Sequence, residues 1–423
     1  MVCYVALTDP LLIPNISSSA RDDDITKYLP QFNYSRGGWA DHRKPRVESS
    51  AWPPYPITLR QIASHMSGIP RDLPPANLSH WPKSMEGSGL PHYNGLPTPS
   101  ESEIFEAIKS FPLANDPYSP PLYSNTGYAL LGMAALAAHQ AQGGQARTFA
   151  DLIQHDVFKP LGLNGSSFLV TNENIDRVAV AEWDSFEIVR QYPLQSIAEP
   201  AQFSLLQDVD LGTMNPSYGQ LSSVRDLVKL MQTFLDSSRS ESLVSPYSLR
   251  EWVRPTYAWM DDMTEVGLLW EILKVPDSYN RKQRVYQKCT SVFPSCNHQI
   301  DNIDFAVGEF LGHNAGFAFN PTSSFGVVVL ITGWNGDAEE VITKAFKLFQ
   351  PAFDSVHEKG TKKLYAGTWK SEWSNSTAVI SVDDGSLWMD KFTLHGSDIL
   401  AVLRDDHAEK VALTSTGREE EFR

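Results

Sequence analysis

A phenol, a hydroxyl and a carboxamide stand side by side in residues 120–132, which read PPLYSNTGYALLG. Tyr123, Ser124 and Asn125 follow two prolines, which disfavour helix before them, and precede an apolar run that begins at Tyr128. We therefore expect them at a loop-to-helix junction, with their side chains facing a cleft. A tyrosine can accept and donate a proton, and an amide two residues away can bind the same ligand. On its own, Y-x-N also fits a helix start with no chemical role.

Four further segments follow the same order as those of a known family. They are residues 22–32 (DDDITKYLPQF), 57–73 (ITLRQIASHMSGIPRDL), 219–226 (GQLSSVRD) and 312–316 (GHNAG), the last ahead of the strand-like run GVVVLITGW. Together with the Tyr123 segment, they resemble the serine β-lactamase and penicillin-binding-protein-like family. That family includes class C β-lactamases, D-Ala-D-Ala carboxypeptidases, esterases and acyltransferases. The resemblance extends over roughly residues 22–350.

The resemblance implies an α/β (α+β) fold, with a β-lactamase/transpeptidase-like domain whose central antiparallel sheet is flanked by helices. It also implies acyl transfer through a serine ester: hydrolysis of an amide, ester or lactam, or transfer to another acceptor, as in fungal secondary metabolism. Tyr123 would act as general base and acid on a small-molecule acyl substrate. The substrate-binding residues implied by the family are Asn125, His313, Asn314 and Gly316. Ala315 stands where the family has glycine, which puts substrate alignment along that strand in doubt.

The nucleophile motif of the family is missing from this sequence. S-x-x-K places a serine and a lysine on one face of a helix that precedes segment 22–32. No lysine here has a serine three residues before it. Residues 2–7 are expected to be the remainder of that helix. Two interpretations stay open: a truncated chain or gene model of an active enzyme, or a natural inactive relative that binds a ligand or partner. Truncation explains the missing leader and the missing helical turn together.

Several elements must position these residues. An N-cap is expected at Thr58, and a capping box at Ser100 and Glu103. Buried helix is expected over residues 126–142, and Ser222 or Ser223 is expected to cap the helix VRDLVKLMQTFL. Further expectations are a helix at 148–157, antiparallel strands on either side of a turn at 313–314, and a helix at 337–349. The histidine of the HMSG turn, His65, is expected to be a satisfied core residue.

Length and composition predict a globular protein of more than one domain. A chain of 423 residues suggests two or three domains, here expected at 1–356 and 357–423. After a polar linker at 359–363, the runs YAGTW, STAVISV, SLWMDKFTL, DILAVL and KVALT predict β-strands, separated by turns such as the one at residues 383–385 (DDG). They look like part of the C-terminal β-domain of fungal family members. The net charge of −15 argues against nucleic acid and anionic membrane surfaces as partners, and no apolar run reaches ~20 residues.

No metal or cofactor is expected, because neither H-x-H, H-E-x-x-H nor a glycine-rich phosphate loop occurs. The sequence does not indicate an oligomeric state. Five glycosylation sequons suggest export: Asn15, Asn33, Asn77, Asn164 and Asn375. Cys289 and Cys296 could close a short disulfide loop, worth roughly 2–3 kcal/mol, which leaves Cys3 over. Residues 1–20 show no signal peptide, so we expect an exported-type protein whose leader is absent, or a cytoplasmic one if the chain is complete.

Overall fold

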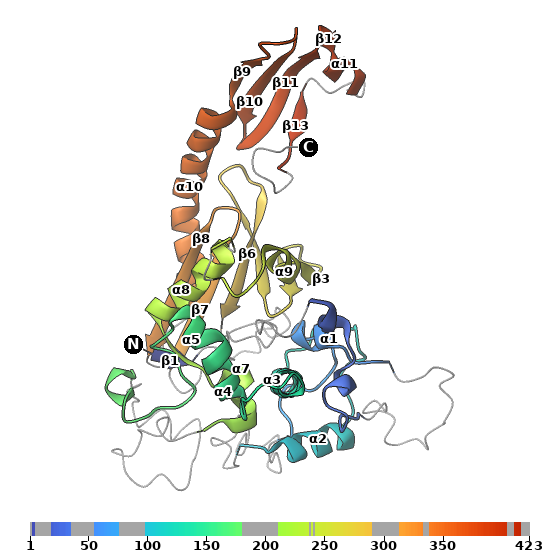
Figure 1. Ribbon diagram of the computed structural model, residues 1–423, viewed down its shortest axis with the longest axis vertical. Helices are drawn as coiled ribbons and strands as arrows, with labels where there is room; N and C mark the ends of the chain where they lie inside the picture. Colours follow the sequence, from blue (N-terminus) through green and yellow to red (C-terminus); the bar gives the residue numbers. More distant parts are fainter. Residues whose placement is uncertain are drawn as a thin grey trace. The chain divides into compact units, whose positions relative to one another are not determined.

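The structure is a computed structural model of the chain (Figure 1), and its described residues form two compact units. It describes residues 2–4, 18–34, 55–75, 98–179, 210–236, 238–239, 242–289, 313–332, 338–403 and 410–415. The first unit comprises residues 1–274 and 284–343, and the second comprises 275–283 and 344–423. The predicted domain boundary at 356/357 falls inside helix α10 (Ala338–Tyr365), which begins in the first unit and continues into the second.

A six-stranded sheet forms the centre of the first unit (Figure 1). Its strands follow the order of the chain: β3 (Pro255–Ala258), β4 (Thr264–Gly267), β5 (Glu271–Pro276), β6 (Lys282–Cys289), β7 (His313–Asn320) and β8 (Phe325–Thr332). The registers described for β3–β4, β4–β5, β6–β7 and β7–β8 are all antiparallel. The antiparallel sheet that the family resemblance implied is therefore confirmed.

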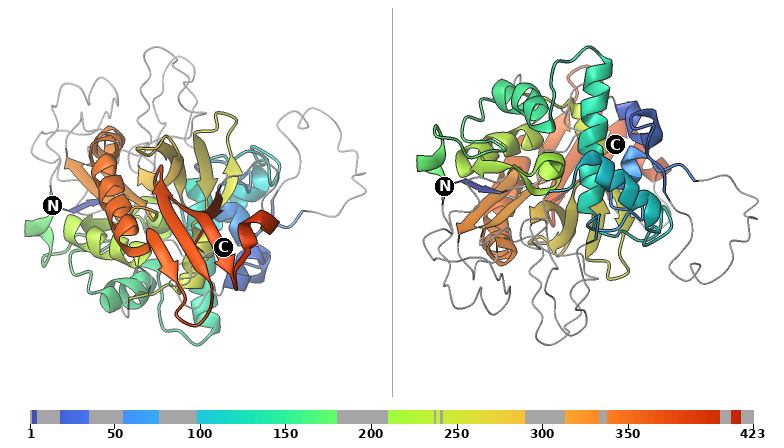
Figure 2. Two further views of the ribbon diagram at one scale, coloured as in Figure 1. Left: turned by 90° about the horizontal axis from the view of Figure 1, so that it is seen from above. Right: turned by 90° about the horizontal axis from the view of Figure 1, so that it is seen from below.

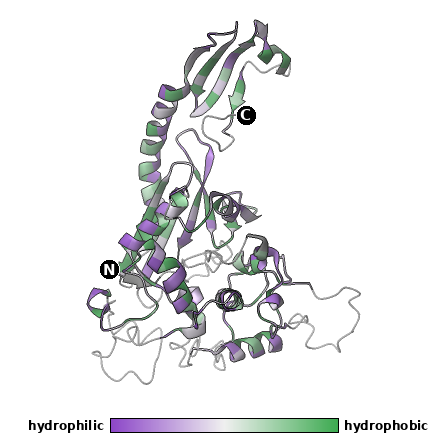
Figure 3. Ribbon diagram, in the orientation of Figure 1, coloured by the Kyte–Doolittle hydropathy of each residue, from purple (hydrophilic) through white to green (hydrophobic). Residues whose placement is uncertain are grey.

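Helix α8 (Val224–Leu235) packs on β7 and β8, and bands of hydrophobic and hydrophilic residues follow one another along it (Figure 3). Its Phe234 ring lies 5.1 Å from that of Trp252 and 5.7 Å from that of Phe319. Trp270 and Phe317 complete this aromatic cluster, at 5.6 Å and 6.0 Å from Phe234. Edge-to-face and offset aromatic pairs of this kind bury large areas and stabilise a core.

A second layer of helices surrounds α3 (Asn125–Ala141), which is buried along most of its length, as predicted. It packs against α1 (Leu59–Ala63), α4 (Phe149–Ile153) and α7 (Asn215–Tyr218), and Figure 2 shows it among the green and blue helices. The other short helices of the unit are η2 (Ser18–Asp22), η3 (Ile25–Lys27), α2 (Glu101–Ser110), η5 (Gln154–Phe158), α5 (Lys159–Leu161), η6 (Ile175–Arg177), η8 (Gly212–Met214) and α9 (Pro246–Trp252).

Side-chain caps fix where these helices begin. Thr58 is the predicted N-cap and also forms a capping box with Gln61, and Ser100 forms the predicted capping box with Glu103. Ser223 caps α8 by accepting a hydrogen bond from the Asp226 amide, which confirms one of the two predicted serines. These caps satisfy amide groups that have no partner inside the helix.

Four expectations about the elements are wrong. Residues 2–4 form strand β1 (Val2–Tyr4), paired with β2 (Leu221–Ser223), and not the end of a helix. Residues 313–314 begin strand β7 instead of forming a turn, because the chain reverses at 321–324, where proline and small polar residues occur. The supposed linker at 359–363 is the last part of α10. The run DILAVL starts helix α11 (Ile399–Leu403) after only two residues of strand.

The second unit is a small antiparallel sheet with the C-terminal part of α10. Its strands are β9 (Gly367–Lys370), β10 (Thr377–Asp383), β11 (Ser386–Leu394), β12 (Ser397–Asp398) and β13 (Val411–Leu413). The order is β12-β11-β10-β9, and β13 also pairs with β11. Asp384 and Gly385 have positive φ angles of 48° and 65°, so they form the predicted tight turn between β10 and β11. The predicted β-rich C-terminal segment is thus confirmed as sheet.

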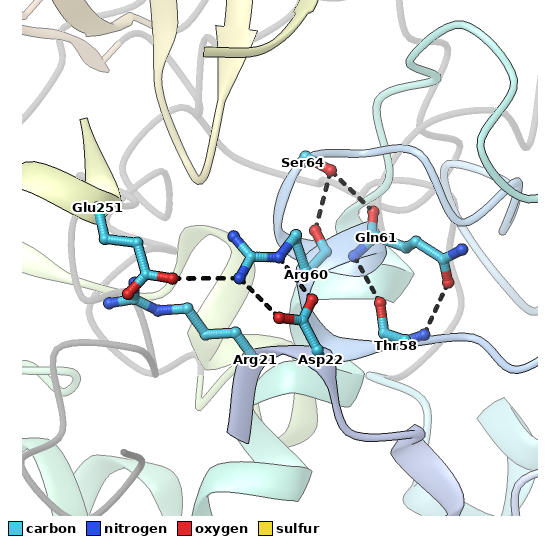
Figure 4. Close-up of polar contacts among 7 residues, drawn as sticks. All are labelled: Arg21, Asp22, Thr58, Arg60, Gln61, Ser64 and Glu251. Carbon is cyan, nitrogen blue, oxygen red and sulfur yellow. Dashed lines mark hydrogen bonds and ion pairs between the residues drawn. The ribbon is translucent and has the colours of Figure 1, made fainter. Parts of the chain in front are cut away.

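An ion-pair network joins η2, α1 and α9 in the first unit (Figure 4). Arg60 donates to both carboxylate oxygens of Asp22, at 2.6 and 2.9 Å, and to Glu251 at 3.2 Å. Nη1 of Arg21, a side chain only 4% exposed, lies 2.7 Å from Glu251 Oε2. This contact is close but poorly aligned for a hydrogen bond, so it acts mainly through charge.

Among the described residues, no helix has both the length and the apolar character needed to cross a membrane.

Candidate active site

Tyr123 lies directly before α3, in a loop that is hydrogen-bonded to the segment after α1. The amide of Leu122 donates to the His65 carbonyl at 2.8 Å, and the amide of Thr126 donates to the Arg71 carbonyl at 3.0 Å. Ser124 caps α3 through Gly127 and also donates its hydroxyl to the Pro70 carbonyl at 2.9 Å. The loop-to-helix junction predicted for residues 123–125 is confirmed, although the helix begins at Asn125.

Rings and cations surround the Tyr123 side chain. The His65 ring stacks on it, with centroids 4.7 Å apart and planes inclined by 27°. Lys288 Nζ lies 5.1 Å from the centroid of the Tyr123 ring, and Arg71 Cζ lies 5.9 Å from it. Both distances are within the range in which a cation is attracted to an aromatic face. Tyr123 is only partly buried, so solvent reaches a phenol that is held between charged groups.

His65 acts as a support for Tyr123. It has a φ angle of 59°, a left-handed conformation that is uncommon for a residue other than glycine. Its Nδ1 accepts a hydrogen bond from the Ser124 amide at 3.1 Å, which places the ring proton on Nε2. Burial, with the nearby charge of Lys288, holds the pKa of His65 well below its usual range. The expectation of a core histidine is confirmed by its burial, and its neutral ring stacks directly on the candidate catalytic phenol.

The side chain of Asn125 is hydrogen-bonded to Asp72, a residue that the sequence analysis did not predict at this site. Its Nδ2 donates to Asp72 Oδ1 at 2.8 Å, and Asp72 Oδ2 lies 3.3 Å from Arg71 Nε. Burial raises the pKa of Asp72, while Arg71 and Asn125 act in the opposite direction. The pKa of Tyr218 is raised as well, mainly by burial of its phenol and secondly by the negative charge of Asp72, so this phenol is protonated at neutral pH. The hydrogen bond to Asp72 thus orients the Asn125 side-chain amide.

Lys288 and Glu271 form a buried ion pair beside Tyr123. Their side chains are 6% and 10% exposed, and Lys288 Nζ donates to Glu271 Oε1 at 3.1 Å. Burial raises the pKa of Glu271 to about 7, with Lys288 opposing this shift. The two residues come from the adjacent strands β5 and β6. They bring a charge pair into the interior of the first unit at the edge of the Tyr123 loop.

The residues predicted around position 313 lie on both faces of β7. His313 is 2% exposed, and its Nε2 donates to the Ala179 carbonyl at 2.9 Å. Alternation along the strand puts Asn314 and Gly316 on the opposite face from His313. That face is covered by α10, because a Cβ on Gly316 would lie 2.5 Å from a side-chain carbon of Ile342. The substrate-binding roles implied for these three residues stay predictions.

The segment 219–226 takes part in a hydrogen-bond network of the scaffold. Asp226 Oδ2 accepts hydrogen bonds from the Gly165 amide at 2.7 Å and from the Ser166 hydroxyl at 2.9 Å. The hydroxyls of Ser166 and Ser222 lie 2.7 Å apart. This buried network fastens the start of α8 to the chain around residue 165, so the G-x-x-S-S-x-x-D pattern contributes to the scaffold that holds the site.

Other predicted residues are only partly described. Asn33, Asn164 and Asn375 are exposed, as glycosylation would require, whereas Asn15 and Asn77 lie outside the described residues. The disulfide proposed between Cys289 and Cys296 cannot be followed, because Cys296 also lies outside them. Within the described ranges, no three or more His, Cys, Asp or Glu side chains group together so that they could hold a metal ion.

Sequence reasoning missed three charged groups at this site: Asp72, Arg71 and Lys288. A weak signal existed for the first two, since RDL directly follows the HMSG turn, and one turn can bring adjacent charges to one cleft. Lys288 stands in the strand-like run RVYQKC, and only the three-dimensional arrangement shows that this lysine points inward. As a set, the described residues offer a phenol able to move a proton, an oriented amide and two cations. These groups can bind and polarise a carbonyl compound.

Comparison with known proteins identifies a family for this chain. The sequence model of the Beta-lactamase family matches residues 19–350. Beta-lactamase-like protein str6 of Strobilurus tenacellus is 36% identical over 282 residues, which are 64% of this chain and 81% of that protein. A protein of Phoma sp. named as a hydrolase is 23% identical over 298 residues, covering 70% of this chain and 41% of that protein. Beta-lactamase-like protein str5 of the same species is 41% identical over 137 residues, which are 32% of this chain and 47% of that protein.

Solved structures share the fold. A β-lactamase/D-alanine carboxypeptidase from Yersinia pestis aligns with a TM-score of 0.51 at 18% identity, over 82% of this chain and 84% of that one. A D-stereospecific amidohydrolase from Streptomyces sp. aligns with a TM-score of 0.52 at 16% identity, over 82% and 86% of the two chains. The match of residues 19–350, together with this class C β-lactamase-like fold, shows that the chain belongs to the Beta-lactamase family, a family of serine hydrolases.

Proposed function

We propose that this protein is a β-lactamase-related serine hydrolase or acyltransferase that acts on an amide, ester or lactam. The observation that carries the proposal is the placement of Tyr123, stacked on the neutral ring of His65 and flanked by Lys288 and Arg71. In the proposed reaction a serine hydroxyl attacks the carbonyl carbon, and Tyr123 takes its proton and passes it to the leaving group. Asn125 binds and orients the acyl group through its amide oxygen.

A second function is favoured by one feature of the sequence. No lysine of these 423 residues has a serine three positions before it, so the family's nucleophile and its lysine cannot be assigned. The alternative is a catalytically inactive family member that binds an acyl ligand or a partner in the same pocket. Both functions use the site around Tyr123, and they differ in whether a covalent bond to the ligand forms.

One assay separates the two functions. The 423-residue protein is incubated with benzylpenicillin, p-nitrophenyl butyrate and D-alanine p-nitroanilide, with and without an added alcohol or amine acceptor. Product is followed by absorbance and mass spectrometry, and intact mass reports any covalent adduct, including one with a fluorophosphonate probe. Turnover that Tyr123→Phe reduces by about 100-fold or more supports the enzyme, since a positioned general base contributes roughly 10²–10⁴.

Saturable binding without adduct or turnover supports the inactive binder. Arg147→Gln, an exposed substitution outside the site, serves as the matched control and should leave every reading unchanged. The proposal is wrong if none of the compounds binds or reacts, or if Tyr123→Phe behaves as the wild type in all of them. Acceptor-dependent product distinguishes the acyltransferase from the hydrolase.

A further inference from the structure

The buried ion pair of Lys288 and Glu271 is the most unusual charged feature in the described part of the first unit. Removing an ammonium and a carboxylate from water costs several kcal/mol per ion, and mutual attraction only partly offsets this. These two side chains are 6% and 10% exposed, yet only one of the two carboxylate oxygens of Glu271 is hydrogen-bonded within the described residues. A packed hydrophobic pair would be at least as stable at this position. Such a pair is therefore a candidate for a functional role.

The position of Lys288 relates it to Tyr123. The amine lies 5.1 Å from the phenol ring centroid. Lys288 is paired across the strands with Phe317 on β7, which fixes its side chain on the same face of the sheet as Phe317. His313 lies on that face too, but four residues along β7, or about 13 Å at the usual rise per residue. The basic group that the β6–β7 pair brings to Tyr123 is thus Lys288.

Burial makes this charge effective. Arg71 also approaches the ring, but its side chain is 43% exposed and is paired with Asp72, so solvent and the neighbouring carboxylate screen it. The Lys288 amine is nearly enclosed, and its field therefore acts at short range with little screening. Lys288 also lies close enough to His65 for its charge to lower the pKa of that histidine, although burial is the larger cause.

We propose that Lys288 is a positioning residue of the Tyr123 site: held by Glu271, it fixes the Tyr123 ring against His65 and supplies positive potential for a ligand's carbonyl or carboxylate oxygen. This inference rests on the proposed function, in which the pocket binds acyl compounds. It assigns to Lys288 a role that does not involve a covalent bond or proton transfer.

Glu271 makes this potential depend on pH. The titratable groups that interact with the pair are His65, kept neutral by burial, Tyr123, whose ring lies beside Lys288, and Glu339 of α10, which contributes to the raised pKa of Glu271. With a pKa of about 7, Glu271 loses its negative charge as the pH falls below neutrality. Lys288 is then less compensated, so an anionic ligand should bind more tightly at pH 6 than at pH 8. The Glu271→Gln substitution should remove that difference.

The test uses the full 423-residue protein and benzylpenicillin, with the neutral methyl ester of benzylpenicillin as the uncharged probe. Affinity is measured by isothermal titration calorimetry for the wild type, Lys288→Met, Lys288→Arg and the double variant Lys288→Met/Glu271→Gln. The double variant removes both charges, so it stays informative if Lys288→Met alone does not fold. Lys109→Met removes one exposed charge and is the matched control.

We expect Lys288→Met and the double variant to bind benzylpenicillin about 10-fold more weakly, or ~1.4 kcal/mol, and Lys288→Arg to stay within about 3-fold of wild type. The methyl ester and Lys109→Met should each show changes of less than about 2-fold. In parallel, proteins carrying ¹³C-labelled tyrosine are compared without ligand, with the Tyr123 resonance assigned by its absence in Tyr123→Phe. That resonance should shift in the double variant and not in Lys109→Met.

The two readings separate failure of this inference from failure of the proposed function. Wild-type affinity in the double variant, with an unmoved Tyr123 resonance, would overturn the role of Lys288 and leave the proposed function standing. If the wild type binds neither probe, the proposed function fails, and the Tyr123 resonance alone decides whether Lys288 positions the ring. An unmoved resonance in that case rejects the inference as well.

Discussion

The substitution Glu251→Gln should destabilise the first unit strongly, because it removes the carboxylate that neutralises a buried arginine. Arg21 is 4% exposed, and its guanidinium lies 2.7 Å from Glu251. Arg60 keeps its bidentate contact with Asp22 in the variant, so the loss falls mainly on Arg21. Breaking one side of a buried ion pair costs roughly 3–5 kcal/mol, since the remaining charge stays buried.

Urea unfolding followed by tryptophan fluorescence measures this loss. Trp252, the residue after Glu251, is 1% exposed and packs on Phe234, so its emission changes when the first unit unfolds. The tryptophans of the second unit, Trp369, Trp373 and Trp388, are replaced by Phe in all proteins compared, so that the signal comes from the first unit even where the two units unfold separately. The matched control is Glu106→Gln, which breaks the exposed pair with Lys109 and should cost less than about 0.5 kcal/mol.

A double substitution checks the physical reason. Replacing Arg21 and Glu251 together by Met and Leu removes both charges, and most of the lost stability should return, because no unpaired charge stays in the interior. A Glu251→Gln protein within about 1 kcal/mol of wild type would refute the reasoning, since it would mean that Arg21 is solvated or compensated in another way.

Three further predictions follow from single sites. Gly68→Ala should lower the free energy of unfolding in urea clearly more than Gly143→Ala. Both glycines have positive φ angles, which cost an alanine roughly 1 kcal/mol, but a Cβ at Gly68 would also lie 1.9 Å from the Asn115 carbonyl oxygen, whereas Gly143 faces open space. Equal losses of stability would contradict this. Burial raises the pKa of Glu271 to about 7, so the folded protein holds this proton more tightly than the unfolded chain. The wild type should therefore lose stability relative to Glu271→Gln as the pH rises from about 4.5 to 7. Unfolding free energies measured across that pH range test this. Asp226→Ala should cost about 1–3 kcal/mol, because the Gly165 amide loses its acceptor and the buried Ser166 hydroxyl keeps only Ser222 as a partner, and a neutral result would reject its scaffold role.

Local sequence rules predicted the parts of the fold that local forces determine. The caps at Thr58 and Ser100 depend on side chains within four residues, and the turn at 384–385 depends on residues that tolerate positive φ. Where long-range pairing decides, the predictions failed. Residues 313–314 look like a turn in isolation, but pairing with Thr332 and Ile331 of β8 draws them into a strand. Residues 2–4 become a strand because β2 offers a free edge.

The candidate site likewise combines residues that the local sequence predicts with residues that only folding brings together. Tyr123 and Asn125 were found because the chemistry lies in three consecutive residues at a helix start. Asp72 and Lys288 are 51 and 165 positions away from Tyr123 in the sequence, and only folding brings them to it. Periodicity in the run RVYQKC does not show on which side of the strand a lysine lies, nor that Glu271 will neutralise it.

Hydrogen–deuterium exchange with benzylpenicillin tests the central claim, that the site around Tyr123 binds acyl compounds, most directly. With saturating compound, we predict slower exchange in peptides covering residues 65–73 and 120–128 of the wild type, and a much smaller change in Tyr123→Phe. Exchange in β10 and β11 of the second unit should stay the same. Protection that is absent at Tyr123, or that appears equally in the variant, would contradict the account.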